Sequence, residues 1–261
     1  MTVRLDEMTW PELDQRVKAT PGAPPVVILS TGALEQHGPH LPLGTDRFLP
    51  ERIAEHVART CGALVAPALP YGYKSQPKSG GGNHFQGCVS LDGATYIAVV
   101  RDILCDLARH GMTRIVLFDG HMENQWFLTE AADLALRQMR CEGVEDLRIV
   151  KLGYWAFINA ATEAILFPDG LLSWELEHAA VMETSCMLHF ARDLVREGEI
   201  PDGPPGDFPL YDIYPTDYAG LPPTGVLSSA ASATADKGAA VVAQVVPDIA
   251  RAIGQAFEER G

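Results

Sequence analysis

Short apolar runs alternate with longer stretches in which apolar residues recur at helical spacing. The apolar runs predict buried strands, and the spaced pattern predicts amphipathic helices. The expected strands are 26–30, 63–67, 114–120 and 147–155. The expected helices are 48–60, 95–111, 124–143, 177–191 and 236–260, with Pro247 expected to kink or break the last one.

This order of elements predicts an α/β fold with a mostly parallel sheet covered by helices on both faces. In such a sheet the carboxyl ends of the strands lie along one edge, where ligands bind. We expect the whole chain, 1–261, to form a single domain. Two long loops, 70–93 and 197–225, interrupt the pattern. Loops of this length serve as lids, binding loops or subunit contacts, and a purely structural role remains open.

Composition narrows the class of partner. The 261 residues carry a net charge of −14, and 47% of them are apolar. So negative a chain is not expected to bind nucleic acid or an anionic membrane, although it can take a small-molecule substrate. The start, MTVRLDEMTW, has no apolar core of the kind found in signal peptides, and no apolar run approaches a membrane span. Five scattered cysteines without a C-x-x-C pair indicate free thiols in a reducing cytoplasm.

Ligand-type side chains follow two of the expected strands. Glu35 and His37 come shortly after the first, and Asp46 follows a turn rich in Gly and Pro. His121 and Glu123 repeat the i, i+2 spacing directly after the third strand. Residues two apart on an extended segment point the same way. Each strand end therefore delivers one imidazole and one carboxylate.

This mixture of imidazole and carboxylate suits Zn²⁺ or Mn²⁺ better than Ca²⁺ or Mg²⁺. Five ligands exceed what one tetrahedral ion with an open position needs, and they fit two ions that share a bridging carboxylate. The simpler alternative is that they are ordinary polar loop residues.

Several motifs together resemble the creatininase family. They are GALEQHGPHLPLGTD, YGYKSQPKSGGGNHFQGCVSLDGAT, ARHG, GHMEN and EHAAVMETS, and they cover nearly the whole chain. The resemblance implies a three-layer α/β/α sandwich, two divalent metal ions (zinc or manganese) per subunit, and a homohexamer.

The resemblance also implies roles for individual residues. One ion would be held by Glu35, Asp46 and His121. The other would be held by His37, Asp46 and Glu123, so that Asp46 bridges the two.

On the substrate side, the resemblance places Ser79 near the substrate and makes Trp155 and Trp174 the walls of the pocket. It makes His178 the proton-transfer residue and Glu183 a nearby carboxylate. The sequence by itself leaves plainer readings open: the two tryptophans fit a core, and His178 fits a helix start.

Two positions depart from the creatininase pattern beside the substrate. Met122 stands where creatininase has Tyr, and Glu175 stands where it has Asp. Neither change removes an expected metal ligand. Because both positions lie beside the expected substrate, the two changes affect which substrate the site would accept.

The expected reaction is hydrolysis of a cyclic amide, most directly creatinine to creatine. A hydroxide shared by the two ions would attack the carbonyl, His178 would protonate the leaving nitrogen, and Glu123 would help to move the nucleophile's proton. One alternative is a related hydrolase acting on another cyclic amide, an imide, a formamide or a peptide end. The other is a metal-binding or ligand-binding protein without catalysis.

Overall fold

The centre of the protein is a four-stranded parallel sheet. The computed structural model describes residues 2–20 and 22–258. The strands lie in the order β2-β1-β3-β4. Their bounds are β1 Val26–Thr31, β2 Leu64–Leu69, β3 Arg114–Asp119 and β4 Arg148–Gly153. The predicted α/β class and parallel sheet are therefore confirmed, with β4 ending two residues earlier than expected.

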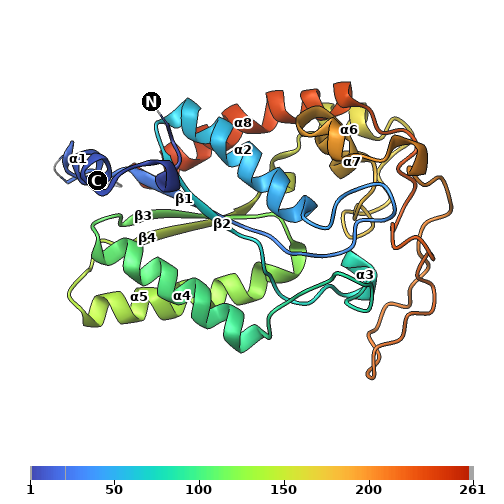
Figure 1. Cartoon of the computed structure of the whole chain (residues 1–261), viewed down its shortest axis with the longest axis horizontal. Coiled ribbons are helices and arrows are strands. Elements are labelled where there is room, and N and C mark those ends of the chain that lie inside the picture. The colour runs from blue at the N-terminus through green and yellow to red at the C-terminus, as the bar shows by residue number, and fades with distance from the viewer. Residues whose placement is uncertain (1, 21, 259–261) are drawn as a thin grey trace.

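Helices cover both faces of the sheet (Figure 1). One layer contains α2 and α8 with α6 and α7 near the end of the sheet, and the opposite layer contains α4 and α5. The α-helices are α1 Trp10–Lys18, α2 Thr45–Cys61, α3 Pro77–Gly80, α4 Gly93–Arg109, α5 Gln125–Cys141, α6 Ala160–Leu166, α7 Val181–Phe190 and α8 Ala235–Phe257. The 3-10 helices are η1 Leu5–Glu7, η2 Met122–Asn124, η3 Tyr154–Phe157, η4 Arg192–Leu194 and η5 Glu197–Glu199.

The apolar strands are continuous runs because both of their faces are buried. In β3, Val116 and Phe118 pack into the core beneath α2 and α8, whereas Ile115 and Leu117 pack into the core beneath α4 and α5. Successive side chains of a strand point to opposite faces, so one apolar run supplies both cores.

Two of the predicted helices differ from the structure. The helix expected at 177–191 begins only at Val181, and residues 177–180 form a turn. Ala179 in that turn has a φ of 55°, a left-handed conformation that an α-helix cannot contain. The helix expected at 236–260 runs from Ala235 to Phe257 without a break at Pro247, and a kink there stays a prediction. The last residues of that prediction, 259 and 260, lie outside the described part of the chain.

Two short helices, α1 and α6, were not predicted from the sequence. The helix α1 has no fully buried residue, but Leu13 and Val17 pack against the core beneath α4 and α5, and its start is marked by the capping box of Thr9 and Glu12. The helix α6 has seven residues and is capped by the Asn159 side chain. Among the described residues, no helix is both long and apolar enough to cross a membrane.

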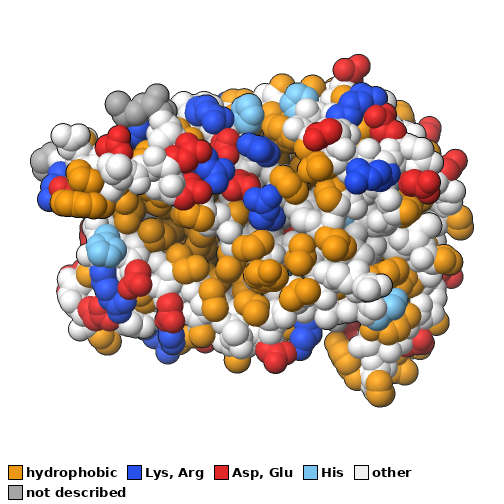
Figure 2. Space-filling view, in the orientation of Figure 1, with side chains coloured by type: hydrophobic (Ala, Val, Ile, Leu, Met, Phe, Trp, Pro, Cys, Tyr) orange, Lys and Arg blue, Asp and Glu red, His pale blue; other side chains and the backbone are white. Residues whose placement is uncertain are grey.

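Two loops lie at the carboxyl edge of the sheet. Residues 70–93 contain α3 and pair with neighbouring backbone at Tyr73–Leu91 and Leu34–Val89. The other long loop includes residues 207–220, which we call the arm. The arm extends away from the body beside α3 (Figure 1), and much of its surface is apolar (Figure 2).

Candidate metal centre and active site

The site begins where β1 and β3 end side by side, with Thr31 paired to Asp119. The Asp119 carboxylate accepts hydrogen bonds from Thr31 Oγ1 at 3.0 Å and from Asn124 Nδ2 at 3.1 Å. Asn124 Nδ2 also donates to the Gly32 carbonyl, and the Asn124 side-chain oxygen accepts from Tyr73 N–H at 2.8 Å. These bonds tie together the turns that carry the expected ligands.

Gly120 allows the ligand-bearing turns to come this close. A Cβ at Gly120 would lie 2.4 Å from the Asp46 carbonyl oxygen and 2.5 Å from a side-chain carbon of Pro50. Any larger residue would push the start of α2 away from the end of β3. The short distance between Asp46 and His121 therefore depends on this glycine.

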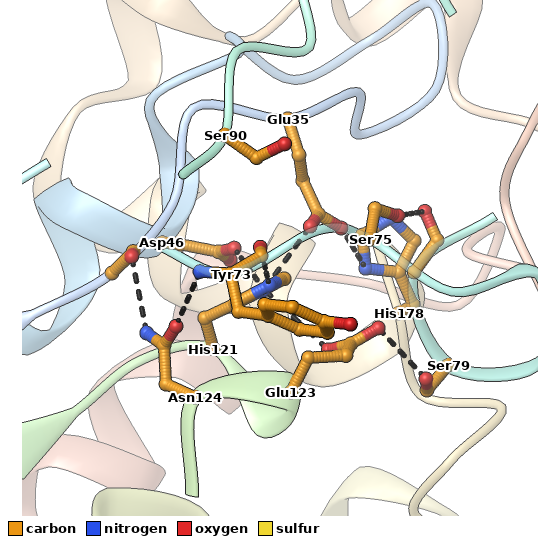
Figure 3. A network of polar contacts seen from close by, with 12 residues as sticks. Glu35, Asp46, Tyr73, Ser75, Ser79, Ser90, His121, Glu123, Asn124 and His178 are labelled. Atoms are coloured by element: carbon orange, nitrogen blue, oxygen red, sulfur yellow. Dashed lines mark hydrogen bonds and ion pairs between the residues drawn. The ribbon is translucent and has the colours of Figure 1, made fainter. Parts of the chain in front are cut away.

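Glu35, Asp46 and His121 meet in one buried group (Figure 3). His121 Nδ1 lies 3.0 Å from Glu35 Oε2 and 3.1 Å from Asp46 Oδ2. The other Asp46 oxygen, Oδ1, lies 2.8 Å from His37 Nε2. Asp46 thus turns one oxygen toward each histidine, which is the geometry of a bridging carboxylate.

Both histidines are oriented as metal ligands usually are. His121 Nε2 lies 3.0 Å from the Tyr73 carbonyl oxygen, and His37 Nδ1 lies 3.2 Å from the Glu35 carbonyl oxygen. A proton on each of these nitrogens would satisfy the bond to the carbonyl and leave the other nitrogen free to bind an ion.

Glu123 lies on the His121 side of the centre. Its Oε2 is 3.6 Å from His121 Nδ1, and its Oε1 accepts hydrogen bonds from Ser79 Oγ at 2.8 Å and Gln76 N–H at 3.0 Å. The carboxylate grouped with His37 and Asp46 is that of Glu183, whose Oε2 lies 3.7 Å from His37 Nε2. The expected set of His37, Asp46 and Glu123 remains a prediction.

The buried polar atoms of this centre fit divalent cations. Within the described chain, both carboxylate oxygens of Glu35, Oδ2 of Asp46 and Nε2 of His37 make no hydrogen bond, although they face the other ligand atoms at the short distances given above. Buried polar groups without a hydrogen bond cost about 1–3 kcal/mol each, more for charged ones. Burial raises the pKa of Glu35 well above its ordinary value, and the Asp46 and Glu123 carboxylates raise it further. Positive ions among these atoms would relieve both costs.

His178 lies at the centre, in the turn before α7 rather than in the helix. Its Nδ1 is 3.3 Å from Glu35 Oε1, and its ring centroid is 4.4 Å from that of His37. Burial and the neighbouring His37 lower the pKa of His178 well below its ordinary value. His178 also lies close enough to Glu35 and His37 to share an ion with them.

Two carboxylates hold the His178 turn in place. Glu177 accepts a hydrogen bond from Met182 N–H, and Glu183 Oε2 accepts one from Ala179 N–H at 2.6 Å. Because both bonds close on the first turn of α7, the position of His178 is fixed relative to that helix. No role for Glu177 was predicted from the sequence.

Gln36 was also missed, although it stands between two expected ligands. Its Nε2 donates to the carbonyl oxygens of Gly80 at 3.0 Å and Gly225 at 2.8 Å, and lies 3.0 Å from His178 Nε2. Gln36 therefore joins three segments around the centre. Gln36 is adjacent to Glu35, so on an extended segment its side chain is expected to point away from the Glu35 side. No feature of the sequence therefore indicated that Gln36 supports the centre.

A small inner pocket of about 40 Å³ lies over the centre. Its lining includes the expected residues Ser79, Met122, Trp155, Trp174, His178 and Glu183, together with Asp46, His121 and Glu123. Both tryptophans are partly buried and also pack against the core, so they combine the two roles considered for them. Glu175 is exposed and lines a neighbouring groove instead.

Two other histidines near the loops lie outside the centre. His40 is buried, with Nε2 2.8 Å from the Thr184 hydroxyl, which fits a structural role. His84 is exposed and stacks on Tyr218 of the arm, with ring centroids 3.9 Å apart.

The sequence is similar to those of characterised hydrolases. A family model described as creatininase, creatinine amidohydrolase, matches residues 6–253. Creatinine amidohydrolase from Pseudomonas putida is 48% identical over 257 residues, covering 98% of both chains. The mycofactocin precursor peptide peptidase of Mycobacterium ulcerans is 30% identical over 87% of this chain and 84% of its own.

Solved structures agree with this relationship. A manganese form of creatininase superposes with a TM-score of 0.95 at 47% identity, covering 99% of this chain and 100% of its own. A Zn–Zn form of a mutant creatininase has a TM-score of 0.96, and a mutant complexed with creatine has 0.95, both at 46% identity and the same coverage. From the matching family model and the full-length likeness in sequence and fold, we conclude that this chain belongs to the creatininase family.

Proposed function

We propose that the protein is a metal-dependent hydrolase of small cyclic amides, with creatinine as the first candidate substrate and creatine as the product. The observation that carries this proposal is the buried group of Glu35, Asp46 and His121 next to His37, in which oxygen and nitrogen atoms face one another without hydrogen bonds. The 48% identity to creatinine amidohydrolase over nearly the full chain supports creatinine as the substrate.

Two ions, zinc or manganese, would be held by Glu35, Asp46 and His121 and by His37, Asp46 and Glu123. Rotation of the Glu123 side chain, or participation of Glu183, would complete the second set. Ions bound here would lower the pKa of a shared water and so supply hydroxide near neutral pH.

The chain's own residues would perform the rest of the reaction. Trp155 and Trp174 would hold the planar ring in the inner pocket. Addition of water to the ring carbonyl and cleavage of its carbon–nitrogen bond give a carboxylate and a free guanidine nitrogen. That nitrogen needs a proton to leave, and His178 at the pocket would deliver it. Ser79 and Glu123, joined by a hydrogen bond, lie beside the same space.

The decisive experiment is a creatinine-to-creatine assay on the purified protein, with its metals quantified. We expect two ions per subunit, turnover that a chelator abolishes, and recovery when Zn²⁺ or Mn²⁺ is restored. Loading with two ions and no turnover of creatinine would refute this substrate.

A second candidate is a related amidohydrolase with another substrate. Met122 in place of the tyrosine of creatininase, and the 30% identity to peptide peptidases, favour it. A panel of lactams, imides, formamides and short peptides would separate the two. A protein that binds two ions and hydrolyses none of these would instead be a binding protein.

We also propose that the chain forms one domain and assembles with copies of itself in the cytoplasm, as a hexamer by resemblance to creatininase. Leu210, a fully exposed apolar side chain on the arm, supports self-association. The five cysteines are unpaired, which suits a reducing compartment.

A further inference from the structure

The inner pocket borders a second, much larger space. A groove of about 830 Å³ shares Ser79, Met122 and Glu123 with the inner pocket of about 40 Å³. A water molecule needs roughly 10–15 Å³ on this measure, so the inner pocket holds only a small planar head group. The groove has the size of a small-molecule site, typically about 300–1,000 Å³. Anything larger attached to the head group must lie in the groove.

Aromatic side chains form the walls of the groove. On one side stand Trp126, which is 82% exposed, and Phe127, whose ring packs 4.0 Å from that of Tyr73. On the other side lie Tyr211 and Tyr214 of the arm. An exposed tryptophan facing exposed tyrosines across a groove is a surface that aromatic or aliphatic groups can fill.

The arm is fastened to the active-site loop at this point. Lys78 Nζ donates to the Tyr211 carbonyl oxygen at 2.7 Å and pairs with Asp212 Oδ1 at 2.9 Å. Lys78 directly precedes Ser79 of the inner pocket. The wall of the groove is therefore tied to the wall of the inner pocket.

The groove is negatively charged. Lys78 is the only basic side chain that lines it within the described chain, and Asp212 already neutralises it. The acidic side chains Glu175, Asp207 and Asp217 also line the groove. Such a surface favours a neutral or cationic group, which aromatic faces also attract, and disfavours an anion.

Met122 stands where the two spaces join. It is a flexible, unbranched side chain that can adapt to a ligand passing beside it. The tyrosine that the creatininase pattern has at this position would be a larger, more rigid barrier.

From this geometry we propose that the substrate carries an apolar or aromatic substituent, neutral or cationic, which lies in the groove between α5 and the arm while its amide ring occupies the inner pocket. This inference rests on the proposed cyclic-amide hydrolysis and narrows its substrate class.

The test compares creatinine with six analogues, three at each of two attachment positions. A benzyl group replaces the N-methyl group or is attached to the ring methylene, and each benzyl compound is also made with a para aminomethyl or a para carboxylate group. We expect kcat/KM for the better benzyl isomer to exceed that for creatinine about tenfold. This factor corresponds to the stabilisation that one aromatic pair contributes in addition to the burial of its surface. The aminomethyl form should match the benzyl form, and the carboxylate should be at least about tenfold poorer. Turnover of creatinine without any preference for a benzyl isomer would overturn the inference.

Two variants locate the substituent. Trp126→Ala should lower the ratio of kcat/KM for the benzyl analogue to that for creatinine, and Met122→Tyr should lower it too. Trp10→Ala removes a tryptophan that is 80% exposed on α1 and should leave the ratio as it was. A ratio that Trp126→Ala does not change contradicts the proposal.

Binding separates this inference from the proposed function. Calorimetric titration with the ring-opened benzyl product should show binding that Trp126→Ala weakens, whether or not the protein turns over creatinine. If creatinine is not hydrolysed but this binding is found, the proposed reaction fails and the groove site stands. If Trp126→Ala instead dissociates an oligomer and leaves ligand binding unchanged, a second copy of the chain covers the groove and the inference is wrong.

Discussion

The ligand cluster at the ends of β1 and β3 and the arm border the same opening, but different forces hold them. Glu35 and His121 are only 2% and 3% exposed, and the turns that carry them are fixed by hydrogen bonds to Asp119 and Asn124. Tyr214 on the arm is 75% exposed, and the arm reaches α3 through the Lys78 contacts.

The difference shows what each region needs to complete it. The centre places unpaired polar atoms in the interior, where a cation stabilises them most strongly. The arm places apolar surface in water, where a substrate group or another subunit stabilises it. Changes in the centre should therefore affect chemistry, and changes in the arm should affect recognition and assembly.

The largest effect is expected from Asp46→Ala. Each oxygen of Asp46 faces a different histidine, so the variant should lose both ions and nearly all activity, a drop of more than about a thousandfold. Metal analysis of the purified variant measures this directly. Asp133→Ala on the exposed face of α5 is a matched control. Full metal content in Asp46→Ala would disprove the bridging assignment.

His178→Ala should separate chemistry from metal binding. If His178 delivers the proton, the variant keeps both ions while kcat falls by about a hundred- to ten-thousandfold. Single-turnover kinetics and metal content measured on the same preparation provide the test. Loss of an ion would instead make His178 a ligand, as its closeness to Glu35 and His37 allows.

Gln36→Ala tests how the centre is supported. The variant removes bonds to the Gly80 and Gly225 carbonyls, so the free energy of unfolding should fall by about 1–3 kcal/mol. Displacement of His178 should lower kcat by roughly tenfold or more, with a smaller change in KM. Gln138→Ala, which removes one exposed contact to Glu142, serves as the control. If Gln36→Ala is as stable and as active as the unchanged protein, Gln36 does not position His178.

Leu210→Asp should have the smallest effect on the subunit and the clearest effect on assembly. Leu210 is fully exposed at the arm, so subunit stability should change by less than about 0.5 kcal/mol. Light scattering should show a smaller particle, whereas Ile165→Asp on α6, also an exposed apolar residue, should leave the particle size unchanged. If Leu210→Asp assembles normally, self-association does not use this part of the arm.

The sequence was sufficient for the elements that carry a long, regular pattern. The strands β1 and β3 are buried on both faces, so their apolar runs identify them without tertiary information. Helices α4 and α5 show an amphipathic stripe over 17 residues each. A short element such as α6, with seven residues, buries too few of them for a periodic signal.

Ligand types and their approximate meeting place could also be predicted from the sequence. Glu35 and His37, and again His121 and Glu123, follow parallel strands, and parallel strands end at one edge. An extended segment was expected at both places, but Glu123 lies in the 3-10 helix η2. Spacing along the chain therefore did not show which carboxylate approaches which histidine.

Only the tertiary structure decided how the centre is held and what it opens onto. The hydrogen bonds of Gln36, Asp119 and Asn124 join segments distant in the chain, and the turn at Ala179 places His178 outside its predicted helix. The groove exists because the arm returns beside α5, about 90 residues later in the chain. Local patterns record the period of one element, whereas distances between elements follow from packing, which no single segment encodes.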